Sequence, residues 1–276
     1  DNGGGTLLPL INADIPEGSV SYATLQDEIN ASANGATITL NSNVTESVTI
    51  PEDAVITLDL NGYSITATDL KAIVNMGELT LISTADGKEA KIIGTTTAVF
   101  NGTNSGNDDV YGNSSKLSLE NVCLETTGAS AVALNNSFAS IEYIKDCKIT
   151  ATAGCTALSN SGYIGSITGT TLYVADSTGL FATKGKAIVI NGDQYVEKSG
   201  VVDSVENCAI TGNISIAKNS VEAVGCIRTI DAASYESFTQ NNGVLDIKEG
   251  GFKFSCENGT FGIASAPEML PEGNAS

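Results

Sequence analysis

An internal repeat of apolar residues restricts the fold of this chain more than any other feature. From Ile141 to Ala151, apolar side chains recur with the spacing I-x-x-I-x-x-C-x-I-x-A. The pattern fits one unit earlier at Leu119, and it starts again at Ile164, Val202, Val221 and Val244. A unit of about 20–25 residues cannot bury its apolar face alone, but stacked units share one continuous core. The three-residue steps indicate bends between short strands, and each bend returns an apolar residue to the inside.

A second repeat places asparagine at a matching position of successive units. The pattern Ala-x-x-Asn ends at Asn75, Asn101, Asn136 and Asn160. A buried amide at a tight bend needs partners for its donors and its acceptor, and a stacked Asn in the next unit supplies them. Asn is also common in ordinary turns, so four unrelated turn residues are the alternative interpretation. Both repeats together predict a parallel β-solenoid.

These features resemble a known family. The coil length, the stacked Ile, Val and Cys positions and the Asn ladder resemble the right-handed parallel β-helix of pectate lyase-like proteins, the pectin lyase-like superfamily. Residues 22–62 resemble the N-terminal coils of bacterial cell-surface and secreted members. The resemblance covers roughly residues 20–263 and implies an all-β, single-stranded right-handed parallel β-helix of about nine coils, whose open end a short helix plugs. It implies no activity, because this fold carries enzymes, adhesins and phage fibres.

The ends of the chain are assigned from local patterns. A helix is expected from Ser21 to about Ala33, where Tyr22, Leu25 and Ile29 share one face. The predicted organisation is a flexible N-terminal tether at 1–18, a β-helix domain at 19–263 with its capping helix within 19–35, and a C-terminal tail at 264–276. The Gly-rich start suits either a tether trimmed after a lipid-bearing cysteine or an ordinary frayed terminus. The segment from Glu257 to Glu272 is expected to cover the other end.

Composition excludes several chemistries. The chain has 32 Asp+Glu against 13 Lys+Arg, a formal charge of −19, and neither His nor Trp. Without His there is no Ser-His-Asp triad, no Cys-His pair and no His-ligated zinc. So acidic a surface argues against nucleic acid as a partner. No apolar run approaches the roughly 18 residues of a membrane span. An extracellular or cell-surface monomer is expected. The six cysteines are interpreted as buried free thiols, with disulfides as the alternative that an even number in an exported chain suggests.

Two long intervals between repeats predict a cleft. One is the insertion at 102–116. The other is at 184–201, where Asn191-Gly192 suggests a β-hairpin and Thr183 takes the position of the ladder Asn. Both insertions would then leave the solenoid at the same edge, with two plain coils between them. The predicted ligand-binding residues are the floor residues Glu142, Tyr143, Lys145 and Tyr163, beside Ser166 and Thr168, and the wall residues Tyr111 and Tyr195. Tolerated insertions with exposed tyrosines are the alternative.

Metal binding and catalysis have weaker support. Asn107, Asp108 and Asp109 offer oxygen ligands of the kind that Ca²⁺ prefers, although their spacing equally suits a polar loop. No other cofactor is indicated. Arg228 aligns in the repeat with Lys148 and Thr171, and no acidic cluster surrounds it. The leading hypothesis is therefore a non-catalytic exported module that recognises a polysaccharide or a cell-surface glycan. Two alternatives remain: a glycosidase or lyase with an unrecognised carboxylate pair, and a purely structural stalk.

Overall fold

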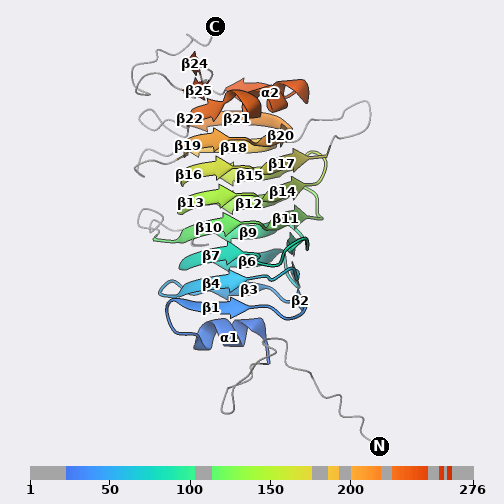
Figure 1. The fold of residues 1–276 in the computed structure, drawn as a ribbon, viewed down its shortest axis with the longest axis vertical. Coiled ribbons are helices and arrows are strands. Elements are labelled where there is room, and N and C mark those ends of the chain that lie inside the picture. The colour runs from blue at the N-terminus through green and yellow to red at the C-terminus, as the bar shows by residue number, and fades with distance from the viewer. Residues whose placement is uncertain are drawn as a thin grey trace, which may run out of the picture.

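The chain forms a parallel β-helix, in which three sheets run along the length of a rod (Figure 1). This computed structural model describes residues 23–102, 114–175, 186–192, 200–218, 226–247, 255–257 and 260–262. Each coil adds one strand to each sheet, except that the last coil lacks a strand of the second sheet. The third sheet has eight strands, so the described residues form eight coils. The sequence predicted about nine. Neither helix within these ranges has the length and apolar character needed to cross a bilayer.

The strands of each sheet follow at regular sequence intervals. The first sheet contains, in parallel, β1 Ala36–Thr39, β4 Val55–Asp59, β7 Glu78–Ile82, β10 Lys116–Glu120, β13 Ser140–Lys145, β16 Tyr163–Thr168, β19 Val201–Glu206 and β22 Cys226–Asp231. The second contains β2 Val44–Thr45, β5 Ile65–Thr66, β8 Lys91–Gly94, β11 Cys123–Thr126, β14 Lys148–Ala151, β17 Thr171–Val174 and β20 Ala209–Thr211. The third contains β3 Val48–Ile50, β6 Lys71–Asn75, β9 Thr97–Asn101, β12 Val132–Asn136, β15 Thr156–Asn160, β18 Lys186–Gly192, β21 Asn213–Lys218 and β23 Leu245–Ile247.

The apolar repeat forms the core, with one difference from the prediction. Ile141, Ile144 and Ile149 are fully buried and stack on Ile164, Ile167 and Leu172 of the next coil. The second three-residue step, from Ile144 to Cys147, is a bend, where Asp146 takes a φ of 51°. The first step, from Ile141 to Ile144, lies inside β13, where the pairing with β10 skips one residue. That step is therefore a β-bulge. One extra residue in the strand returns the next apolar side chain to the inside, as a bend would.

The asparagine ladder is confirmed. Asn75, Asn101, Asn136 and Asn160 have no exposed surface. The amide nitrogens of the first three each donate to the amide oxygen of the next Asn, at 2.7, 2.8 and 2.7 Å along the row. The same nitrogens also donate to backbone carbonyls where the third sheet turns into the first, for example Asn101 to the carbonyl of Ser140 at 3.0 Å. The buried amides are therefore satisfied at each of these bends.

A second row of small hydrogen-bonding side chains lies at the bend between the first and second sheets. Cys147, Thr170 and Cys208 each donate from Sγ or Oγ1 to the carbonyl oxygen two residues earlier, at 3.2, 3.1 and 3.3 Å. The Cys147 N–H donates to Thr170 Oγ1 at 3.2 Å. The thiols of Cys123, Cys147, Cys155 and Cys208 are free. The prediction of buried free thiols is confirmed for three of them, and Cys123 is half-buried.

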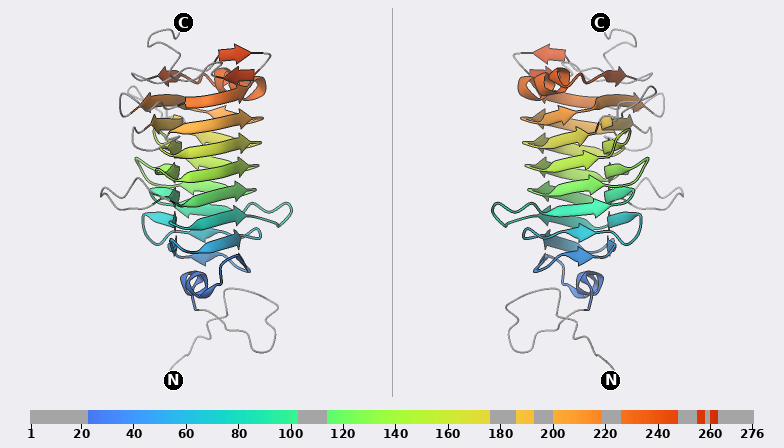
Figure 2. Two further views of the ribbon diagram at one scale, coloured as in Figure 1. Left: turned by 90° about the vertical axis from the view of Figure 1, so that its left-hand side faces the viewer. Right: turned by 90° about the vertical axis from the view of Figure 1, so that its right-hand side faces the viewer.

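Helix α1, Leu25–Ala31, covers the N-terminal end of the rod as predicted (Figure 2). Leu25 and Ile29 are buried against the first coil. Gln26 accepts from the Thr49 N–H at 2.7 Å and donates to the Thr49 carbonyl at 2.9 Å, which satisfies the open edge of β3. Glu46 in turn accepts from the N–H groups of Leu25 and Gln26 at the start of the helix. An exposed strand edge would otherwise pair with other chains.

A second helix, α2 at Ala232–Gln240, was not predicted and covers the C-terminal end. It takes the place of a strand of the second sheet in the last coil and packs on β20. Ser234 Oγ accepts from the Cys208 N–H at 2.8 Å, and Ser237 Oγ accepts from the Ile210 N–H at 3.1 Å. The predicted covering segment, Glu257 to Glu272, contributes the antiparallel strand β25, Thr260–Gly262, which pairs with β22 and with β24, Ser255–Glu257.

The register of the last two repeats was predicted wrongly. Ile227 and Ile230 pair with Val202 and Val205, so they begin the last coil, whereas the prediction placed Ile227 third in a unit that starts at Val221. Val221 and Val224 lie outside the described residues. The prediction also placed Ile247 second in a unit that starts at Val244. Ile247 lies in β23 of the third sheet instead. The spacing of Val221, Val224 and Ile227 resembles the repeat by chance. The unit that does match begins at Ile227, and α2 interrupts it after Ile230.

The predicted hairpin at Asn191-Gly192 is also wrong. Residues 186–192 form β18, a parallel strand between β15 and β21. Ile190 pairs with Asn160 and is fully buried, so Ile190 occupies the ladder position that was predicted for Thr183. The second interval therefore splits into 176–185, between β17 and β18, and 193–199, between β18 and β19. Only 193–199 falls at the same bend as 103–113.

Candidate functional site

The outer face of the first sheet brings together the predicted floor residues. Glu142, Tyr143 and Lys145 lie on β13, and Tyr163 begins β16 on the next coil. Tyr143 pairs with Ser118 on one side and Ser166 on the other, and it is half-buried. The ring of Tyr163 lies on the adjacent coil, where Tyr163 pairs with Ser140 three residues before Tyr143. These two tyrosines therefore lie on adjacent coils of the same face.

Bulges in β13, β16, β19 and β22 align one extra residue on each coil. On each coil the pairing skips one residue, which lies between a paired residue that faces the core and a paired residue that faces outward. The skipped residues are Glu142, Gly165, Asp203 and Arg228. We define these four residues as the bulge row. Glu142 and Arg228 are exposed and Asp203 is half-buried. A β-bulge redirects side chains relative to the regular pleat, so this row adds charged groups beside the tyrosines.

Asp203 connects Tyr163 to Arg228. The Tyr163 hydroxyl donates to Asp203 Oδ2 at 2.5 Å, and Arg228 Nη1 lies 2.9 Å from Asp203 Oδ1. Oδ1 is buried and makes no aligned hydrogen bond, so its contact with Arg228 is electrostatic. The hydrogen bond to Asp203 raises the pKa of Tyr163, because it favours the protonated phenol. Asp203 therefore fixes the orientation of the Tyr163 ring.

Gly165 allows this arrangement. A Cβ at Gly165 would lie 3.6 Å from the Tyr163 hydroxyl and only 2.5 Å from the carbonyl oxygen of Glu142. Real Cβ atoms essentially never come within 3.0 Å of another atom, so a larger residue would displace β13. Gly165 therefore contributes no side chain to the bulge row between Glu142 and Asp203.

Lys145 is held by an ion pair across the coils. Its Nζ lies 2.5 Å from Glu120 Oε1 on β10, and both side chains are exposed. The hydrogen bond with Glu120 raises the pKa of Lys145. Surface ion pairs of this kind contribute little to stability, but they orient long side chains. Lys145 thus forms one margin of the face and the Asp203–Arg228 pair forms the other.

The remaining predicted residues cannot be placed. Tyr111, Tyr195 and the predicted calcium ligands Asn107, Asp108 and Asp109 lie outside the described residues. Of the predicted loop walls at 102–116 and 184–201, residues 103–113, 184–185 and 193–199 lie there as well. Within the described ranges, no three Cys, Asp or Glu side chains are grouped so as to hold a metal ion.

Sequence reasoning missed Asp203 and misplaced Arg228. The predicted alignment put Arg228 beside Lys148 on the second sheet, but it lies beside Asp203 on the first. The spacing of Ile227 and Ile230 repeats that of Val202 and Val205 and could have given the correct register. With that alignment, an acidic and a basic residue fall on adjacent coils at the same position.

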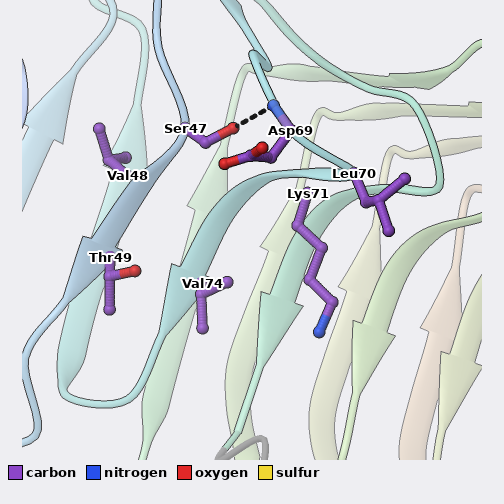
Figure 3. A pocket seen from close by; sticks show the side chains of 7 residues that line it. All are labelled: Ser47, Val48, Thr49, Asp69, Leu70, Lys71 and Val74. Carbon is purple, nitrogen blue, oxygen red and sulfur yellow. Dashed lines mark hydrogen bonds between the residues drawn. The ribbon is translucent and has the colours of Figure 1, made fainter.

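A pocket of about 380 Å³ lies elsewhere, on the third sheet near the N-terminal end (Figure 3). Ser47, Val48, Thr49, Asp69, Leu70, Lys71 and Val74 line it. The Asp69 N–H donates to Ser47 Oγ at 3.0 Å, and Lys71 Nζ lies 3.9 Å from the centre of the Phe100 ring. Burial lowers the pKa of Lys71. Its open shape and its mixed apolar and charged lining single out no ligand class.

Comparison of the chain with protein-family models, with curated proteins and with solved structures found no match. The function must therefore be inferred from the face itself.

Proposed function

We propose that this protein is a non-catalytic carbohydrate-binding module whose binding surface is the outer face of the first sheet around Tyr143 and Tyr163. The observation that carries the proposal is the pair of half-buried tyrosines on adjacent coils, with Tyr163 fixed by Asp203. Aromatic rings provide large contact areas for sugar rings, and hydroxyls and charged groups around them provide hydrogen bonds. A face that is ordered before binding loses little conformational entropy on binding.

The finer identity belongs to the same proposal. We infer a pectate lyase-like relative that a bacterium secretes or exports to its surface, where a lipid-anchored tether would attach it. Support comes from the resemblance of the coils and from the Asn ladder, which the fold shares with that superfamily. The net charge of −19 favours a surface fixture over an enzyme for anionic pectin, whose uronates this surface would repel.

The test is a broad glycan array with matched tyrosine variants. Tyr143→Ala should reduce the signal of the best-bound glycan at least tenfold, because the substitution removes one ring from the centre of the face. Tyr173→Ala is the control, since Tyr173 is a 40% exposed tyrosine on the outer face of the second sheet. If both variants retain the wild-type signal, or if the wild type binds no glycan, the proposal is wrong.

A second pair of variants separates the ring of Tyr163 from its hydroxyl. Tyr163→Phe removes the bond to Asp203 but keeps the ring, whereas Tyr163→Ala removes both. We expect Tyr163→Phe to weaken glycan binding a few-fold and Tyr163→Ala at least tenfold. Equal losses would assign the effect to Asp203 and not to stacking on the ring.

A specific observation also favours a second candidate, a glycoside hydrolase. Glu142 and Asp203 share the bulge row two coils apart, with only Gly165 between them. Twice the coil spacing of about 4.8 Å separates their backbones by roughly 10 Å, while inverting glycosidases place their carboxyl groups about 6.5–9.5 Å apart. Release of reducing ends from a polysaccharide panel, abolished by Glu142→Gln, would establish hydrolysis. Binding without release would leave the module non-catalytic.

A further inference from the structure

The central outward position of the first sheet carries a hydroxyl on every coil. The residues that pair there in sequence are Thr37, Thr57, Thr80, Ser118, Tyr143, Ser166, Ser204 and Thr229. We call this set the hydroxyl row. It runs along the rod axis at about 4.8 Å per coil and passes through Tyr143.

In the other two sheets, the equivalent outward position does not carry a hydroxyl on every coil, so exposure alone does not explain the hydroxyl row. The equivalent row of the second sheet is Thr45, Thr66, Ile93, Glu125, Thr150, Tyr173 and Thr211. That of the third sheet is Thr49, Val74, Phe100, Asn135, Ser159, Val189, Ser215 and Asp246. Both rows mix apolar, charged and polar side chains, although the β-propensity requirements are the same. The hydroxyl row is therefore particular to the face that carries the tyrosines.

The hydroxyls of this row are largely unused within the protein. Thr229 Oγ1 donates to the Asp203 carbonyl at 2.9 Å. None of the other seven makes a side-chain hydrogen bond within the described part of the chain. Ser118 is only 7% exposed, and it lies on the outer face because its neighbours Leu117 and Leu119 are in the core. None of these seven hydroxyl oxygens is a buried atom that lacks a partner, so each reaches solvent and is available to a ligand.

Charge on the two sides of the row indicates the class of that partner. The cations that flank it are each paired: Lys116 with Glu78 at 3.3 Å, Lys145 with Glu120 at 2.5 Å and Arg228 with Asp203 at 2.9 Å. Glu142 and Glu206 are exposed, and no ion pair engages either among the described residues. The face thus keeps an excess of negative charge, which opposes an anionic ligand.

We propose that the hydroxyl row binds a neutral polysaccharide chain that extends along the rod axis and crosses Tyr143. This inference rests on the proposed function and adds the direction and the charge class of the ligand. An extended chain of pyranose rings repeats at a distance close to the coil spacing, so successive sugars meet successive hydroxyls. Each coil that the chain crosses then adds hydrogen bonds, and affinity rises with oligosaccharide length.

The test combines a length series with substitutions remote from the tyrosines. Di-, tetra- and hexasaccharides of neutral β-1,4-linked glucose, xylose and mannose are titrated by calorimetry, with hexagalacturonate as the anionic comparison. Thr57→Val with Thr80→Val removes two hydroxyls from the row while keeping the side-chain shape. Thr45→Val with Thr66→Val is the matched control, because it removes two outward hydroxyls from neighbouring coils of the second sheet.

The expected result is a neutral hexasaccharide that binds at least tenfold more tightly than its disaccharide. The Thr57 and Thr80 variant should lose about tenfold in hexasaccharide affinity, because two hydrogen bonds to the ligand are removed, and the control should lose less than about twofold. If Tyr143→Ala weakens binding but all oligosaccharide lengths bind equally, or the threonine variant binds as the wild type does, binding along the hydroxyl row is wrong. The proposed function then still stands. Tighter binding of hexagalacturonate overturns the neutral class. Absence of binding by any probe, together with a blank glycan array, overturns both.

Discussion

At the scale of single residues, the Asn ladder buries polar amides that are unfavourable alone and uses them to specify the register of the coils. Asn136 illustrates this, because it accepts from Asn101 at 2.8 Å and donates to Asn160 at 2.7 Å while fully buried. Each amide would be unfavourable alone, and each is satisfied only when the neighbouring coils are in register. A slip of one residue would leave buried donors without acceptors, so the ladder fixes the register of the third sheet.

Removing one rung should therefore destabilise the protein strongly. We expect Asn136→Ala to lower the free energy of unfolding by about 3 kcal/mol, since it leaves a buried amide on each side with one partner fewer. Asn135→Ala is the control, because Asn135 is the adjacent residue of β12 and faces outward. It should change the free energy by less than about 0.5 kcal/mol. Urea unfolding of both variants measures the difference, and equal effects would show that the ladder is not stabilising.

The ladder could be predicted from sequence because its signal is local. Four residues, Ala-x-x-Asn, recur with both the buried small residue and the amide in place. Asp203 and Arg228 could not be assigned in the same way, because their contact depends on the register of the last coil. An error of a few residues there moved Arg228 to another sheet. Short apolar repeats identify the core residues. The predicted neighbours of an outward residue depend on the exact register, so an alignment error places that residue on the wrong sheet.

At the scale of secondary-structure elements, both ends of the rod are closed by helices that use polar side chains. Gln26 of α1 bonds both backbone groups of Thr49, and Ser234 and Ser237 of α2 accept from the backbone of β20. Helix α1 could be predicted because Leu25 and Ile29 have helical spacing. Helix α2 has the sequence AASYESFTQ, whose sheet-facing residues include two serines. Apolar periodicity cannot detect a helix that caps an edge through hydroxyls.

The serines of α2 give a prediction at this scale. Ser234→Ala with Ser237→Ala should leave the N–H groups of Cys208 and Ile210 without acceptors and lower stability by about 2–4 kcal/mol. Their amide hydrogens should exchange much faster than in the wild type, as hydrogen–deuterium exchange can show. Glu236→Ala, on the exposed side of the same helix, is the control. Unchanged exchange at residues 208–210 in the double variant would contradict the capping role.

At the scale of the whole molecule, the buried thiols make the rod sensitive to alkali. Burial raises the pKa of the Cys147 thiol from 9.0 to about 12 and that of the Cys208 thiol to about 11. In the unfolded chain both thiols would lose their protons near pH 9. The stability that the neutral thiols contribute is therefore complete below pH 9, and it is lost as the pH rises toward 11–12.

The expected loss is measurable and can be isolated from the other charges. Each thiol should remove about 1.4 kcal/mol per pH unit above 9, so both together remove about 4 kcal/mol by pH 10.5. General repulsion in a chain of net charge −19 also grows with pH, but it affects wild type and variant alike. Thr170 stands between the two cysteines and makes the same bond to a carbonyl two residues earlier, so Cys147→Thr with Cys208→Thr preserves the row. Denaturant unfolding from pH 8 to 10.5 should show a shallower decline for this variant than for the wild type. Parallel declines would mean that the two thiols ionise as readily in the folded rod as in the unfolded chain.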